Sequence, residues 1–400
     1  MIARVLSVCA FTACFAVNAI GASTTSLKPI DPVAIQSAVE AVAREFLVPG
    51  ALVALHTPKD EFVFGYGTTE LGAAIPPRAN THFRAASNSK TMTAAVILQL
   101  AQEQRLRLDD PISRYVQDVP NGDHITIDQL LRMRSGLYNY TNAPELAENL
   151  DRKPNKVWTS EELRTIAFKQ PPLFAPGAEY DYCNTNYLLL GLVVEKVEGQ
   201  PLGNSFQTRL FGPLGMKQTA LPAASSNTLP EPYSHGYLYG GSSHALVDAP
   251  YPADLQAAAK AGTLKPNDDT AQNPSYAWAA GGIASTADDL AIWMRALVGG
   301  KVFGPDYQRQ WIQSPAPIDP RHPDGQRYGY GISLITFGPN KMYFHGGEMP
   351  GYNSFMGYDP VNDVTLIVWT SLTVSVDGRS PANTLMLRLL DLIYTVSPSR

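Results

Sequence analysis

The chain has 400 residues, of which 44% are apolar, and its formal net charge is -5. This apolar content suffices for a substantial core and excludes a disordered or purely fibrous protein. Because the charge is weakly negative and the sequence contains no run of lysine and arginine, nucleic acid is not an expected partner.

The first 22 residues follow the order of a secretory signal peptide. Arg4 precedes an apolar run over residues 5–17, and small residues follow up to Gly21 and Ala22. The run is shorter than the ~20 apolar residues that a membrane span requires. We therefore predict cleavage near Gly21 or Ala22, a mature domain over residues 23–400 with no stable membrane span, and a periplasmic or secreted location.

Cleavage would remove two of the three cysteines, Cys9 and Cys14. Neither follows a convincing lipoprotein recognition sequence, so a lipid anchor is the disfavoured alternative. Cys183 would remain as the sole thiol, and the mature chain could then form no internal disulfide. The seven histidines are scattered without the spacing of a metal site, which disfavours a zinc hydrolase, and no metal is expected.

The N-terminal part of the mature chain predicts one helix and one hairpin. Asp31 is a cap, Pro32 suits the first helical position, and apolar residues recur at spacings of three and four up to Phe46. Two β-type runs follow, at 51–56 and 62–66, with turn residues between them.

Helical patterns dominate the middle of the chain. A broad apolar surface from Lys90 to about Arg107 predicts a helix that is buried between layers. Residues 112–197 are mostly helical with proline and glycine interruptions, and residues 205–276 predict long loops over a helical subdomain.

The C-terminal part predicts a helix over 285–297, with Ser285 as its cap, and a final helix over 381–394. The strand-like runs between these helices lie at 330–336, 342–345, 354–358 and 364–370. Strands at both ends of the chain with helices between them predict an α+β fold.

In this fold, one antiparallel sheet is built from N- and C-terminal strands, within about 31–85 and 280–400, and helices flank it. A mostly helical subdomain is inserted at about 90–275.

Ser87 and Lys90 open the buried helix and lie three residues apart, so the amine can reach the hydroxyl. A lysine activates a serine only if desolvation or a cationic setting keeps its amine neutral part of the time, and the apolar surroundings favour this. The Ser-x-x-Lys pattern is the nucleophile motif of β-lactamases and penicillin-binding proteins. By itself it also fits an ordinary helix start.

Two further motifs could complete a site. In Tyr182-Cys183-Asn184, the tyrosine hydroxyl could relay a proton and the asparagine amide could bond a substrate carbonyl and the lysine. In His345-Gly346-Gly347, the glycines would let a substrate backbone approach a sheet edge, and His345 could orient the transferred group. Each motif alone also fits a plain loop or turn.

The order of the three motifs resembles the serine β-lactamase and penicillin-binding-protein superfamily in its class C-like branch. Stretches such as FRAASNSKTMTAAVILQL, LLRMRSGLYNYTN and YDYCNTNYLLLGLVVEKVEG extend the resemblance from about Phe83 to Gly357. The spacing is most similar to that of the soluble D-alanyl-D-alanine carboxypeptidases.

The resemblance implies an acyl-Ser87 intermediate with Lys90 and Tyr182 as proton carriers, and Asn184 and His345 as substrate-positioning residues. It implies an oxyanion hole made by the backbone N–H groups of Ser87 and of a residue near Glu348. It also implies hydrolysis by water without a cofactor. β-Lactams are implied as acylating inhibitors.

The chain departs from the resembled enzymes around the third motif. Where the β-lactamases carry Lys-Thr-Gly and the carboxypeptidases His-Thr-Gly-Thr, it has His345, Gly346, Gly347 and Glu348, and the strand at 330–335 has no arginine. A substrate with an anionic terminus would therefore find fewer hydrogen-bond donors here, and the carboxylate of Glu348 would repel it. Glu348 would instead favour a substrate that carries an amine. The alternative is that Glu348 is a solvated loop carboxylate without a role in binding.

The first expectation is therefore an exported serine hydrolase that acts on D-alanyl peptides, as a D-Ala-D-Ala carboxypeptidase does. The alternatives are an esterase or a D-aminopeptidase or amidase of the same fold. A second alternative is a weak β-lactamase, or a non-catalytic penicillin-binding sensor, which would need only Ser87 and Lys90.

Overall fold

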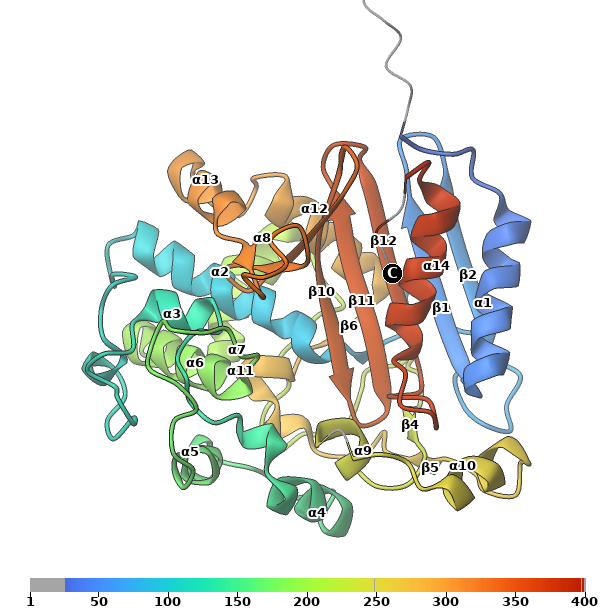
Figure 1. Ribbon diagram of the computed structural model, residues 1–400, viewed down its shortest axis with the longest axis horizontal. Coiled ribbons are helices and arrows are strands. Elements are labelled where there is room, and N and C mark those ends of the chain that lie inside the picture. The colour runs from blue at the N-terminus through green and yellow to red at the C-terminus, as the bar shows by residue number, and fades with distance from the viewer. Residues whose placement is uncertain (1–25, 248, 397, 399–400) are drawn as a thin grey trace, which may run out of the picture.

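A computed structural model describes residues 26–247, 249–396 and 398 (Figure 1). The segment predicted as a signal peptide lies outside these residues, so its role stays a prediction. The described chain has the expected α+β architecture, with one large antiparallel sheet, helices on both of its faces and a helical subdomain beside it.

Within the described residues, the large sheet has eight strands in the order β2-β1-β12-β11-β10-β9-β8-β7. In chain order these are β1 (Gly50–His56), β2 (Glu61–Gly67), β7 (Ala316–Pro317), β8 (Arg327–Tyr328), β9 (Ser333–Phe337), β10 (Asn340–Met349), β11 (Tyr352–Asp359) and β12 (Val364–Thr370). All neighbours are antiparallel, and β1 pairs with β12 from Ala51 opposite Thr370 to His56 opposite Thr365. The two ends of the chain therefore form one sheet.

One face of the sheet is covered by α1 (Pro32–Phe46) and α14 (Pro381–Ile393), which lie side by side (Figure 1). Asp31 caps α1 by accepting from the backbone N–H groups of Val33 and Ala34. Apolar residues of both helices and of the sheet, such as Val39, Leu366 and Leu389, form one core.

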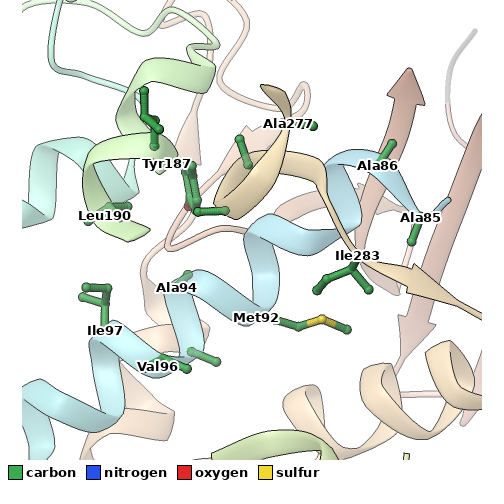
Figure 2. Packing of buried hydrophobic residues seen from close by; sticks show 14 of the residues in the cluster. Ala85, Ala86, Met92, Ala94, Val96, Ile97, Tyr187, Leu190, Ala277 and Ile283 are labelled. Carbon is green, nitrogen blue, oxygen red and sulfur yellow. The ribbon is translucent and has the colours of Figure 1, made fainter. Parts of the chain in front are cut away.

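The opposite face packs against α2 (Ser89–Gln102), α12 (Ala287–Val298) and the helical subdomain. Every residue of α2 from Ser89 to Leu98 is buried, as expected for a helix between layers. Figure 2 shows this helix with Met92 on the side of Ile283, Ala94 near Tyr187 and Ile97 on the side of Leu190.

The remaining elements either directly precede α2 or lie between it and the last strands. They are β3 (Phe83–Arg84), η1 (Ala86–Asn88), η2 (Ile112–Arg114), α3 (Ile127–Leu131), η3 (Tyr140–Asn142), α4 (Pro144–Arg152), α5 (Ser160–Phe168), α6 (Asn184–Glu198), α7 (Leu202–Phe206), η4 (Gln207–Phe211), α8 (Gly212–Leu214), β4 (Tyr237–Leu238), α9 (Ser243–Leu246), α10 (Ala253–Lys260), β5 (Asn267–Asp268), η5 (Pro274–Tyr276), α11 (Trp278–Gly281), β6 (Ala284–Ser285) and α13 (Pro305–Gln313). The segment expected as long loops thus contains short helices.

Three expected boundaries were wrong. The buried helix ends at Gln102 rather than near Arg107, because Gln104 adopts a left-handed φ of 59° and reverses the chain. Thr286, not Ser285, caps α12: its side chain accepts from Asp289 N, whereas Ser285 pairs with Phe83 in a small sheet. The strand expected from 330 starts later, at Ser333.

The strand expected at 342–345 is also longer than expected. β10 runs from Asn340 to Met349, so the His345-Gly346-Gly347 motif lies inside the strand rather than in a turn after it.

Candidate active site

Ser87 is presented by a sharp turn between a short strand and the buried helix. β3 ends at Arg84, and Ala86 takes a left-handed φ of 50°, which is uncommon for a residue with a side chain. Asn88 fixes the turn, since its Nδ2 donates to Ala85 O and to Ser354 Oγ of β11, both at 2.9 Å. The half-buried Ser87 therefore stands at the N-terminal end of α2, where backbone N–H groups have no acceptor within the helix.

Lys90 is fully buried one turn further along, with an amine that contacts three acceptors. Its Nζ lies 2.9 Å from Ser87 Oγ, 2.7 Å from Asn184 Oδ1 and 2.7 Å from the carbonyl oxygen of Ala280 in α11. Burial lowers the pKa of Lys90 well below its ordinary value. The amine is thus close to the Ser87 hydroxyl and predisposed to be neutral.

Asn184 is the first residue of α6, and η3 together with its N-cap residue Asn139 orients it. Its Nδ2 donates to Thr141 Oγ1 at 2.9 Å, and its backbone N–H donates to Asn139 Oδ1 at 3.0 Å. These bonds leave Oδ1 directed at Lys90. Asn139 and Thr141 were not predicted as site residues, although both lie in LYNYTN, a stretch that carries the family resemblance.

Tyr182 completes a group of four polar side chains. Its ring centroid lies 4.9 Å from Lys90 Nζ. Burial raises the pKa of Tyr182 far above its usual range, and a hydrogen bond with Ser87 only partly opposes this. The hydroxyl is therefore protonated at neutral pH. The structure brings Ser87, Lys90, Tyr182 and Asn184 together, as their expected roles require.

The third motif lies on a strand edge that faces these groups. β10 pairs with β9 only up to Phe344, whereas it pairs with β11 as far as Met349. Residues 345–349 therefore have an edge that β9 leaves uncovered, next to the turn that carries Ser87. Gly347 allows the close approach of strand and turn, because a Cβ there would lie 2.2 Å from Ala85 O.

His345 is buried and hydrogen-bonded at both ring nitrogens. Nδ1 lies 2.6 Å from Gly346 O, and Nε2 lies 3.2 Å from the hydroxyl of Tyr328 in β8. Burial, together with the nearby Lys90, lowers the pKa of His345 to about 3. The imidazole is therefore neutral at physiological pH, and it offers no cation to a substrate.

Side chains alternate along β10, so Gly346 and Glu348 face the α14 side of the sheet. Glu348 Oε2 accepts from Asn353 Nδ2 at 3.2 Å and from Ser380 Oγ at 3.1 Å. A Cβ on Gly346 would meet only ordinary contacts, at 3.6 Å from Ser354 O and 3.7 Å from Asn383 Oδ1. This strand face is thus polar and carries a carboxylate.

These residues line one cleft of about 630 Å³. The Ser87 side is lined by Tyr180, Tyr182, Asn184, Asn139 and Thr141, and the far side by Ile335, Phe344, Met386 and Leu387. All eight predicted site residues lie in or beside this cleft. Lys90 lies beneath its floor. Tyr180 and Tyr328 were not predicted as site residues. Tyr180 precedes Tyr182 by two positions, as same-side residues of an extended segment do.

The structure describes the ranges 26–247, 249–396 and 398. No helix in these ranges is long and apolar enough to cross a membrane. No group of three or more His, Cys, Asp or Glu side chains in them could hold a metal ion.

A serine with a desolvated amine at its hydroxyl, in a cleft beside an open strand edge, defines a serine hydrolase. The chain belongs to the family described as Beta-lactamase, whose model matches residues 37–391. This match confirms the family resemblance and the fold that it implies.

Two curated relatives illustrate the relationship. Protein flp of Staphylococcus aureus (strain N315) is 25% identical over 334 residues, which are 81% of this chain and 60% of that protein. The Putative penicillin-binding protein PbpX of Bacillus subtilis (strain 168) is 26% identical over 309 residues, 77% of this chain and 66% of that protein. The chain thus spans about three fifths to two thirds of the length of these relatives.

Solved structures match over more of their length. A D-stereospecific amidohydrolase from Streptomyces sp. is 28% identical with a TM-score of 0.75, over 89% of this chain and 98% of that one. The D-amino acid amidase of Ochrobactrum anthropi SV3 complexed with L-phenylalanine amide is 25% identical with a TM-score of 0.71. The match covers 89% of this chain and 96% of that one. A penicillin binding protein from Bacillus halodurans, 22% identical with a TM-score of 0.70 over 88% and 98%, shares the fold.

Proposed function

We propose that the chain hydrolyses D-amino-acyl bonds through an ester on Ser87. Ser87 Oγ attacks the substrate carbonyl while Lys90 takes the hydroxyl proton, and Tyr182 passes a proton to the departing amine or alcohol. Backbone N–H groups of Ser87 and of the strand near Glu348 stabilise the oxyanion, and each such donor lowers the barrier by about 3 kcal/mol. Water then attacks the ester, its proton returns to Ser87, and the acid is released.

The leaving group that the cleft favours is uncharged. A substrate carboxylate needs cationic or N–H donors, but His345 is neutral with both nitrogens engaged, and Gly346 supplies no hydroxyl. Glu348 adds a negative charge to the same strand edge. The engaged, neutral His345 is the observation that carries this choice, and on it we propose D-amino acid amides ahead of D-Ala-D-Ala peptides as substrates.

The names of similar proteins support the same order of substrates, with amides ahead of D-Ala-D-Ala peptides. The names of two solved neighbours, a D-stereospecific amidohydrolase and a D-amino acid amidase, state activity on amides with D-selectivity. D-Ala-D-Ala carboxypeptidase activity, the first expectation from the sequence, stays the second candidate. It is favoured by the position of His345, where the carboxypeptidases that the sequence resembles also have histidine, and by the penicillin-binding name of one curated relative.

A substrate panel tests the proposal. Rates would be compared for D-alaninamide, D-Ala-p-nitroanilide, a short-chain p-nitrophenyl ester, a D-Ala-D-Ala peptide and nitrocefin. We expect kcat/KM for the amides and ester to exceed that for the D-Ala-D-Ala peptide. The opposite order would support the carboxypeptidase and reject the preference for an uncharged leaving group.

The nucleophile is tested in the same preparation. Ser87→Ala should abolish turnover and covalent labelling by a fluorophosphonate or a fluorescent penicillin, because it removes the only atom proposed to be acylated. Ser89→Ala is the matched control, since Ser89 is fully buried and its hydroxyl donates to Ala86 O. Labelling that persists in Ser87→Ala would locate the nucleophile elsewhere, and acylation without release on every substrate would indicate a sensor.

Export is a separate proposal that rests on residues 1–22 alone. We propose that this segment directs secretion or periplasmic delivery and is removed near Gly21 or Ala22. The N-terminal sequence of the protein recovered after expression in a bacterial host, with the cell fraction that contains it, tests this. A protein retained in the cytoplasm with residue 1 intact would contradict it.

A further inference from the structure

The hydrogen bonds of His345 fix which ring nitrogen carries the proton. Nδ1 lies 2.6 Å from the carbonyl oxygen of Gly346. A carbonyl oxygen only accepts, so Nδ1 must be the protonated nitrogen. In a neutral imidazole the other nitrogen, Nε2, is then an acceptor.

Tyr328 supplies the donor for that acceptor. Its hydroxyl lies 3.2 Å from His345 Nε2, and the two rings meet edge to face with centroids 5.9 Å apart. Both side chains are only 3% exposed. The hydroxyl of Tyr187, which donates to Leu131 O at 3.1 Å, also lies beside the Tyr328 hydroxyl, and its oxygen is a second acceptor there. Among the described residues, only the Tyr328 hydroxyl lies within hydrogen-bonding distance of Nε2, so we assign it as the donor to His345.

This pair determines what the cleft presents to a substrate. With Nδ1–H turned to its own backbone and Nε2 capped by a hydroxyl, His345 directs no N–H at the space above Ser87. A carboxylate oxygen that approached Nε2 would meet a lone pair already in use. An amide or ester group would need no charged donor at this point.

We propose that Tyr328 is a specificity-determining positioning residue, which holds His345 as a neutral acceptor and thereby excludes substrates with an anionic terminus. The inference rests on the proposed function, because it concerns the leaving group that reaches Ser87. It adds a residue on a separate strand, β8, that need not contact the substrate.

A purely structural role for Tyr328 is separable from this one. Its ring lies 5.8 Å from that of Tyr180 and 6.3 Å from that of Tyr182, so the ring contributes to packing in the cleft wall. Tyr328→Phe keeps the ring and removes only the hydroxyl. Tyr343→Phe is the matched control, because Tyr343 lies on β10 two residues before His345 and stacks on Trp311, outside the cleft.

The first measurement is the protonation of His345 by NMR of protein with ¹⁵N-labelled histidine. In the wild type and in Tyr343→Phe, Nδ1 should carry the proton and Nε2 should be unprotonated between pH 6 and 8. In Tyr328→Phe, Nε2 loses its donor, so the pKa of His345 should rise and Nε2 should take up a proton at a higher pH than in the wild type. A protonated Nε2 in the wild type would overturn the proposal.

The second measurement compares a D-Ala-D-Ala peptide with the same peptide as a C-terminal amide. The ratio of kcat/KM for the acid to that for the amide should rise about tenfold in Tyr328→Phe, as expected when one donor to a charged group is gained. It should stay unchanged in Tyr343→Phe. An unchanged ratio in Tyr328→Phe would overturn the proposal.

Failure of the proposed function gives a different result. If no D-alanyl substrate is turned over, the proposed function fails whereas the NMR comparison still decides how Tyr328 and His345 are bonded. A D-alanyl carboxylate that protects the protein thermally in Tyr328→Phe, but not in the wild type or Tyr343→Phe, would then support the exclusion of anions. Equal protection of all three would overturn it.

Discussion

Lys90 Nζ lies 2.9 Å from Ser87 Oγ, and its other two hydrogen-bonding directions are occupied by Asn184 Oδ1 and Ala280 O. A neutral amine can donate to these two acceptors with its two N–H groups. Its lone pair then points at the Ser87 hydroxyl, which is the arrangement that a general base requires. The two acceptors also favour the charged amine, so they oppose the effect of burial on the pKa of Lys90.

This balance predicts opposite effects for two substitutions at Asn184. The base must be neutral, so kcat/KM should rise as pH rises through the pKa of Lys90. Asn184→Ala removes an acceptor, lowers the pKa of Lys90 further, and should move this acid limb to lower pH. Asn184→Asp adds a negative charge, raises that pKa, and should move the limb to higher pH.

Profiles of kcat/KM between pH 5 and 9 check this prediction. Both variants should also lose activity overall, by about 10- to 100-fold, because the amine is less precisely placed. Limbs that move in the same direction, or that stay in place, would show that Lys90 is not the titrating group.

The two adjacent glycines of β10 should respond differently to a side chain. Gly347→Ala would place a Cβ 2.2 Å from Ala85 O and 2.6 Å from Ser354 Oγ, so it must separate the strand from the turn that holds Ser87. We expect it to cost about 1–3 kcal/mol of unfolding free energy and most of the activity. Gly346→Ala meets only ordinary contacts and should leave the midpoint of thermal unfolding nearly unchanged.

Calorimetry and acylation rates on the two alanine variants make the comparison. Equal effects of the two substitutions would contradict the packing of β10 against η1. Gly346→Thr is informative in addition, because its hydroxyl would restore a donor where the resembled carboxypeptidases have threonine, and hydrolysis of D-Ala-D-Ala should improve.

Much of the fold could be predicted because the signals were local. Asp31 and Pro32 mark the start of α1, and the runs that became β1 and β12 are apolar enough to identify as strands. The end of α2 was misjudged because Leu106 continues the apolar pattern. In the structure, a left-handed Gln104 turns the chain and buries Leu106 outside the helix. Backbone reversals of this kind leave little trace in hydrophobic periodicity.

The residues of the candidate site likewise divide into those that local spacing predicts and those that it does not. The proximity of Ser87 and Lys90 follows from helical spacing, which is local. Tyr182 and His345 joined them only through the family resemblance, since no periodicity relates residues on different elements. Tyr328 was missed because its role depends on the register of β8 with β9, where Tyr328 faces Ser333 and meets His345 on the next strand.

His345 should also make the stability of the protein depend on pH. Its pKa is lowered to about 3 in the folded protein, against 6.5 for an ordinary histidine, so the unfolded chain binds the proton more tightly. The stabilisation is complete above about pH 6.5 and is lost as pH falls toward 3, by about 1.4 kcal/mol per pH unit for one proton. Denaturant unfolding at pH 4–7 measures this slope.

His345→Asn should flatten that slope, whereas the exposed His124→Asn should leave it unchanged. Equal slopes in the wild type and in His345→Asn would mean that the folded protein accommodates a protonated imidazole at position 345. The assignment of a neutral ring with Nε2 as an acceptor would then be wrong.

Glu348 distinguishes an aminopeptidase or amidase from an esterase within the proposed class. Its carboxylate lies in the cleft, one strand position beyond Gly347, held by Asn353 and Ser380. An α-ammonium group on the acyl part of a substrate would gain charge-assisted hydrogen bonds there, which contribute about 1.5–3 kcal/mol. Glu348→Gln should therefore raise KM for D-alaninamide about tenfold or more, while KM for N-acetyl-D-alaninamide, which has no charge, should change little.

Steady-state kinetics on the two amides decide whether Glu348 binds the substrate amine. Equal effects on both substrates would assign Glu348 to the strand edge alone and would favour an esterase.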